Sequence, residues 1–249
     1  MCEIPKVIYK YKPMTSRDDI IRFFDLIENR RIYLPYINQL NDPFECIMSD
    51  VSFGTAGSSI SRALDIDHQY VVKRKGEIQV LALSEDCCSP QLWAYYCGDY
   101  NGVCLCFKTD KTFQNIKKVN YVQKIASDEM EIAGNTDDAD RLITKRLFLK
   151  QEGWQYEHEW RMIFDHNTER YLEYDHDELI AIIIGHKLDS EIVDFIKNSL
   201  PNNFPIFRTH AGNISGKVRL LPYDYVMIGD GKEPDFIDNT DELIAATTR

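Results

Sequence analysis

WQYEHEWRMIF, residues 154–164, alternates aromatic or branched side chains with polar ones, which is the pattern of a β-strand. On a strand, Glu157, Glu159 and Arg161 project from one face, while the aromatic residues project from the other. Charged groups are costly to bury, so these three must pair with one another or line a cleft. The segment therefore fits either a structural ladder of ion pairs or a site for catalysis or ligand binding.

The composition is that of an ordinary globular protein, with 249 residues, 44% hydrophobic and 28% charged. The 29 basic and 40 acidic residues give a net charge of −11. This charge argues against bulk nucleic-acid binding but allows a local basic pocket for a nucleotide. No stretch has the apolar length of a membrane span, and the first residues lack the pattern of a signal peptide. We therefore expect a cytoplasmic protein that does not associate with membranes.

The cysteines do not have the spacing of a metal site. Seven are present, including the adjacent Cys87 and Cys88 and the pair Cys104 and Cys106, but no Cys-x-x-Cys occurs. Small buried thiols in a reducing compartment explain them better. The histidines also lack ligand spacing, so we expect no bound metal.

The order of predicted elements favours an α+β fold with a mixed, mainly antiparallel sheet and flanking helices. Periodicity predicts strands at 6–12, 31–34, 78–83, 103–107, 119–122, 154–164, 179–185, 205–208 and 218–221. Helices are predicted after Thr15 or Ser16, over 91–96, over 141–149 and over 189–200. We expect a single domain over residues 1–228 and a polar C-terminal tail, 229–249, that frays. The sequence lacks the motifs of dinucleotide-binding, P-loop, zinc-protease and α/β-hydrolase enzymes.

A set of short motifs resembles a bacterial domain-of-unknown-function family that includes AbiGi-type abortive-infection proteins. The resemblance covers most of residues 8–200, and its motifs are YKYKP (9–13), NDPFE (41–45), LSE (83–85), LWAYY (92–96), GVCLCF (102–107) and EHEWR (157–161). The usual family motif has Arg where this chain has Lys12, which keeps the charge but loses the bidentate fork. This resemblance implies a protein of a phage-defence system, with a possible protein partner there.

The order of elements also resembles the ADP-ribosyltransferase fold, which implies that NAD is the substrate. In that fold a first strand carries a basic or aromatic residue, a second strand carries Tyr, a central strand ends in Ser, and a late strand carries the catalytic Glu. Here those places fall to Tyr11 or Lys12, to Tyr33, to Ser84, and to Glu159 or Glu157. A carboxylate beside the ribose stabilises the positive charge that develops when the nicotinamide bond breaks. Glu159 is our first choice for that role, with Glu157 orienting ribose or acceptor.

The remaining candidates each have a structural alternative. Tyr96 and Arg161 join the ligand-binding candidates, while Asn41, Asp42, Glu45 and Trp93 belong to the cleft or to a structural loop. Asn-Asp-Pro is a natural turn, and aromatic residues such as Trp93 are more often core than ligand platform.

Two functions therefore remain open. One is an NAD-consuming transferase or glycohydrolase, and the other is a non-catalytic antitoxin-like or nucleotide-sensing module that uses the same cleft. In both cases we expect Tyr11, Lys12, Ser84, Glu157, Glu159 and Arg161 to converge on one concave site. We also expect Arg161 to form a bidentate bond with Glu45 or Asp42.

Overall fold

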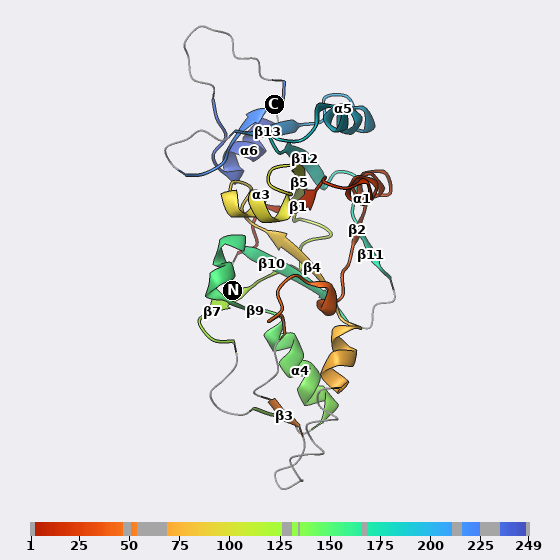
Figure 1. The fold of residues 1–249 in the computed structure, drawn as a ribbon, viewed down its shortest axis with the longest axis vertical. Helices are drawn as coiled ribbons and strands as arrows, with labels where there is room; N and C mark the ends of the chain where they lie inside the picture. The colour runs from red at the N-terminus through yellow and green to blue at the C-terminus, as the bar shows by residue number, and fades with distance from the viewer. Residues whose placement is uncertain are drawn as a thin grey trace.

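An eight-stranded sheet, in the order β14-β13-β12-β5-β1-β4-β10-β6, forms the centre of the computed structural model (Figure 1). The structure describes residues 3–46, 51–53, 69–125, 131–133, 135–165, 169–210, 216–224 and 235–247. The strands of the sheet are β1 (Val7–Pro13), β4 (Gln79–Ser84), β5 (Gly102–Lys108), β6 (Lys117–Lys118), β10 (Glu159–Phe164), β12 (Leu179–Ile184), β13 (Ile206–His210) and β14 (Arg219–Pro222). β12 and β13 are parallel and the other neighbours are antiparallel, so the predicted α+β class is confirmed.

Three short strand pairs and several helices surround the sheet. The pairs are β2 (Arg31–Tyr33) with β11 (Tyr171–Glu173), β3 (Val51–Phe53) with β8 (Glu131–Ala133), and β7 (Asn120–Val122) with β9 (Leu149–Gln151). The helices are α1 (Arg17–Glu28), η1 (Ile37–Gln39), α3 (Pro90–Tyr96), α4 (Thr136–Arg146), η2 (Glu152–Glu157), α5 (Ser190–Ser199) and α6 (Thr240–Thr247), and a further helix occupies residues 69–75. Figure 1 shows α4 at the end of the molecule away from α5 and α6.

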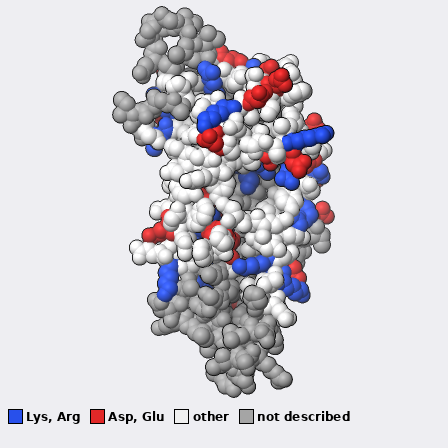
Figure 2. All heavy atoms as spheres, viewed as in Figure 1, with Lys and Arg blue, Asp and Glu red and all other residues white. Residues whose placement is uncertain are grey.

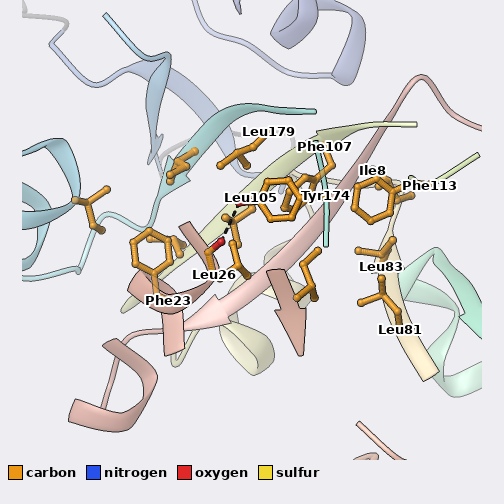
Figure 3. Packing of buried hydrophobic residues seen from close by; sticks show 14 of the residues in the cluster. Ile8, Phe23, Leu26, Leu81, Leu83, Leu105, Phe107, Phe113, Tyr174 and Leu179 are labelled. Carbon is orange, nitrogen blue, oxygen red and sulfur yellow. Dashed lines mark hydrogen bonds between the residues drawn. The ribbon is translucent and has the colours of Figure 1, made fainter. Parts of the chain in front are cut away.

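The alternation of side chains along β1 and β5 divides the core into two layers. Ile8, Leu105 and Phe107 face a layer that contains Phe23 and Leu26 of α1, as Figure 3 shows. Tyr9 and Cys106 face the opposite layer, where α3 and α6 pack. Since each face of the sheet is covered, its central strands are apolar on both sides and hold their neighbours in a fixed register.

Local sequence signals explain where α1 and α4 begin. The Ser16 side chain accepts a hydrogen bond from the Asp19 backbone, and the Asp19 carboxylate accepts one from the Ser16 backbone, which is a capping box. α4 begins at Thr136, earlier than the predicted residue 141, because the Asn135 side chain caps it. Of the predicted helical residues 141–149, only 141–146 belong to α4, and Leu149 begins β9.

The predicted strand over 154–164 is wrong in its first half. Residues 152–157 form the 3₁₀ helix η2, His158 adopts a left-handed conformation with φ 45°, and β10 begins only at Glu159. The left-handed residue turns the chain between Glu157 and Glu159, so these carboxylates reach the same region from different elements.

Residues 235–247, within the predicted C-terminal tail, pack against the sheet. Ile237 forms a β-bridge with Leu220, and Leu243 of α6 is fully buried against the sheet. The Tyr9 hydroxyl donates a hydrogen bond to Thr240 Oγ1 at 2.9 Å. The end of the chain therefore completes the layer that covers one face of β1.

Candidate functional site

The sheet parts between β1 and β4. These strands are paired at Tyr9 and Ser84, after which β1 continues along β5 and β4 continues along β10. Lys10 lies at the point of divergence, and its Nζ donates a hydrogen bond to the Ala82 carbonyl at 2.7 Å. The side chain thereby satisfies a carbonyl that the missing strand pairing would leave open.

A cavity of about 90 Å³ occupies this split. Its walls come from β1, β4 and β10, from the Leu40–Glu45 region, from α3 and from Lys150 of β9. Eight of the residues that we predicted for the site line it, and these are Tyr11, Asn41, Glu45, Ser84, Tyr96, Glu157, Glu159 and Arg161. The sequence therefore identified most of the polar wall of this pocket.

Arg161 is the centre of the buried charge cluster. It is 1% exposed, and its Nε and Nη2 donate to Glu159 at 2.6 and 2.9 Å. Its Nη1 and Nη2 also donate to the two carboxylate oxygens of Glu45, at 2.5 and 3.0 Å, and Nη1 donates to the Leu147 carbonyl at 2.7 Å. The predicted bidentate bond between Arg161 and Glu45 is confirmed, and a second fork binds Glu159.

Lys150 supplies a second cation that the sequence analysis missed. Its Nζ donates to Glu157 and, at 3.2 Å, to Glu159 Oε2. The sequence signal for Lys150 was charge balance, because the three negative charges of Glu45, Glu157 and Glu159 exceed the single positive charge of Arg161. Burying such a cluster requires another cation nearby.

Glu157 and Glu159 have different environments. Burial favours the neutral form of Glu159, but the charges of Arg161 and Lys150 outweigh it and hold its pKa below the usual range. Burial raises the pKa of Glu157, although Lys150 opposes this shift. Glu157 accepts a hydrogen bond from the Tyr96 hydroxyl, which itself accepts one from Asn41 Nδ2 at 2.8 Å. Glu159 is therefore the firmly ionised carboxylate, and Glu157 is the more easily protonated one.

Lys10 is a second unexpected member of the pocket wall. Burial, followed by the charge of Lys12, lowers its pKa to about 7, while Glu159 opposes the shift. An amine with this pKa exchanges its proton near neutral pH. A lysine between Tyr9 and Tyr11 gives no such signal in sequence, because only the parting of the strands encloses its amine.

Lys12 and Tyr33 do not join this pocket, so the expected convergence is wrong for Lys12. Lys12 shares a face of β1 with Lys10 but lies further along the strand, beyond the pairing with β4, and it lines another cavity with Tyr33, between β1, α1 and β2. Asp42 and Trp93 are also outside the pocket lining. Asp42 Oδ1 accepts a bond from the Phe44 backbone, as expected for a turn, and fully buried Trp93 donates to the Cys87 carbonyl at 2.9 Å.

The described ranges contain no group of three or more His, Cys, Asp or Glu side chains arranged to hold a metal. Among the same residues, no helix combines the length and apolar character that crossing a membrane requires.

Comparison with known proteins gives one match. A family model described as a protein of unknown function (DUF2971) matches residues 92–162, which fits the expected domain-of-unknown-function resemblance over this segment. The match includes Lys150, Glu157 and Arg161 but not β1 or Glu45. No curated protein and no solved structure matches the chain.

Proposed function

We propose that the pocket between β1 and β4 is a site of glycosyl transfer from NAD, of the ADP-ribosyltransferase or NAD-glycohydrolase type, with Glu157 facing the substrate. The observation that carries this proposal is the difference between the two carboxylates. Both oxygens of Glu159 accept bonds from Arg161, whereas Glu157 is held by one lysine and one hydroxyl. Glu157, and not Glu159 as the sequence favoured, is therefore the carboxylate that can exchange a partner for substrate.

The chemistry needs one carboxylate that can both stabilise positive charge on the ribose and accept a proton. Breaking the ribose–nicotinamide bond sends its electron pair to the nicotinamide nitrogen and leaves positive charge on the ribose. A carboxylate beside that carbon stabilises the charge, and water or an acceptor hydroxyl then forms the new C–O bond. Glu157 takes the proton that the nucleophile releases. Its raised pKa brings it closer to the operating range of a general base.

A second candidate is a non-catalytic module that senses a nucleotide or binds a protein through the same pocket. The size of the cavity favours the protein-binding form of this alternative, because about 90 Å³ is less than the ~150 Å³ that holds a benzene ring. Side chains must shift before a nicotinamide ring enters. In this alternative the charge cluster has a purely structural role, and the pocket accepts only a small group.

The proposal extends to a biological setting. The motif resemblance to AbiGi-type abortive-infection proteins supports a role in bacterial phage defence or in a toxin system, with a protein partner. A cytoplasmic location is part of the same proposal, supported by the six cysteines among the described residues, which are free and buried.

The test is release of nicotinamide from NAD that carries separate labels on nicotinamide and on adenosine. Wild type is expected to release nicotinamide, and Glu157→Gln is expected to lower turnover by roughly 10²–10³-fold with little change in folding. Glu152→Gln is the matched control, since Glu152 is exposed at the start of η2. Label that remains on protein or nucleic acid would identify transfer, and free ADP-ribose would identify hydrolysis.

Two outcomes would remove this function. If wild type releases no nicotinamide across a broad set of acceptors, the non-catalytic module becomes the better account. If Glu157→Gln and wild type release it equally, Glu157 has no catalytic role.

A further inference from the structure

A second cavity, of about 400 Å³, lies between β1, α1, β2 and β11. The residues that carry its chemistry are Lys12, Arg22, Asp25, Arg31, Tyr33 and Tyr171. Figure 2 shows a hollow bordered by blue Lys and Arg side chains, and its place corresponds to the space between α1 and β1 in Figure 1. Cavities that bind small organic molecules commonly span about 300–1,000 Å³, so this one has the size of a ligand site.

The charge of this cavity is opposite to that of the whole protein. Three cations and one carboxylate line it, giving an excess of two positive charges in a chain of net charge −11. Asp25 is already committed, because both of its oxygens accept bonds from Arg31, at 2.7 and 3.1 Å. Lys12 and Arg22 are therefore the uncompensated pair, and a local positive field of this kind attracts anions.

Lys12 is half-buried and Arg22 is exposed at the rim of the cavity, and neither has a counter-charge of its own among the described residues. Neither forms an ion pair with any residue in the described ranges. Burial and the charge of Arg22 lower the pKa of Lys12, and Asp19 opposes the shift. Asp19 is occupied in the capping box of α1, where it accepts bonds from Ser16. An anion between the two cations would remove their repulsion.

The opposite wall offers aromatic and polar groups. Tyr33 and Tyr171 face each other across the β2–β11 pair, with ring centroids 5.8 Å apart, and both are partly exposed. Gln39 also lines the cavity and its Oε1 accepts a bond from the Tyr36 backbone. Arg170 lies over the Tyr33 ring and Arg31 over the Tyr171 ring, so the ring surface that stays exposed is what the organic part of a ligand can contact.

We propose that this cavity binds an organic phosphate of nucleotide size, with Lys12 and Arg22 on the phosphate and the two tyrosines against the organic part. The volume exceeds the needs of inorganic phosphate, and the charge excess disfavours a neutral ligand. This site is separate from the pocket that contains Glu157, and it does not depend on cleavage of NAD.

The test is isothermal titration calorimetry of the full chain with AMP, ADP, adenosine and inorganic phosphate. AMP and ADP are expected to bind, with adenosine and phosphate each weaker by about tenfold or more. Binding of AMP is expected to weaken as salt rises, because the contacts are charged and partly exposed.

Variants assign the contacts. Lys12→Met and Arg22→Gln are each expected to raise the Kd for AMP by about tenfold, while Lys12→Arg retains binding. Lys108→Met is the matched control, because it removes the same charge from an exposed position at the far end of the β1–β5 pair. Glu157→Gln is expected to leave AMP binding unchanged.

The result that overturns the proposal is absence of AMP and ADP binding to folded wild type. Equal affinity for adenosine and AMP would also overturn it, because the phosphate would then contribute nothing. Equal affinity for phosphate and AMP would remove the tyrosines from the site. If Lys12→Met fails to fold, as judged by circular dichroism, Arg22→Gln decides whether the cations hold the phosphate.

Discussion

Replacing Arg161 with leucine is expected to lower the free energy of unfolding by about 3–5 kcal/mol. The side chain is 1% exposed and donates to Glu45, to Glu159 and to the Leu147 carbonyl. Without it, Glu159 keeps Lys150, but the Glu45 carboxylate loses the only side-chain partner it has among the described residues. The loss is large because a buried carboxylate is left without a counter-charge.

The assay is urea unfolding followed by tryptophan fluorescence, with the slope of the transition checked for change. Arg141→Leu is the control, because Arg141 is 77% exposed in its pair with Asp138, and its loss is expected to cost less than about 1 kcal/mol. Combining Arg161→Leu with Glu45→Gln should recover part of the loss, since the stranded charge is removed. A loss below about 1 kcal/mol for Arg161→Leu would refute the buried cluster.

Three further predictions test other parts of the structure. The stability of wild type relative to Lys10→Met should rise from pH 7 to 10.5. Burial lowers the pKa of Lys10 to about 7, so in this window the folded state binds fewer protons than the unfolded chain. Parallel pH profiles of the unfolding free energy for the two proteins would contradict this prediction. Gly185→Ala should cost about 2 kcal/mol or more in a thermal melt, because the new Cβ would lie 2.1 Å from the Tyr100 carbonyl oxygen. Gly153→Ala is the control, because its Cβ would meet nothing within 4 Å, and it should change stability by less than about 0.5 kcal/mol. Ser84→Ala should cost about 1–3 kcal/mol in urea unfolding, because its hydroxyl donates to the Glu157 carbonyl at 2.7 Å; an unchanged midpoint would show that this bond adds no stability.

The sequence predicted the regular elements because the spacing of their apolar residues follows the repeat of a strand or a helix whose side chains are buried. The apolar run 179–185 corresponds to β12, and the capped amphipathic segment after Ser16 corresponds to α1. It also predicted the Arg161–Glu45 pair, since a buried guanidinium needs a planar acidic partner. These inferences depend on local pattern or on charge balance, and both are visible in one sequence.

The remaining features depend on long-range geometry. The left-handed conformation of His158 ends η2 and is not encoded by a glycine or asparagine, so periodicity extended the strand too far. β1 and β4 separate beyond Tyr9, so Lys10 lines the pocket between them and Lys12 lines another cavity. The alternation of side chains in the sequence does not show which strands pair, and it could not predict this separation. The packing of Leu243 likewise requires knowledge of the face that α6 covers.

The central claim is that the two adjacent carboxylates divide their roles, Glu159 holding the cluster together and Glu157 facing the substrate. The most direct test measures nicotinamide release and urea unfolding for Glu157→Gln and Glu159→Gln in parallel. We predict that Glu157→Gln loses turnover by roughly 10²–10³-fold at nearly unchanged stability. Glu159→Gln should lose stability, because Arg161 and Lys150 then surround a neutral amide. Stability lost only in Glu157→Gln, or turnover lost only in Glu159→Gln, would contradict this division.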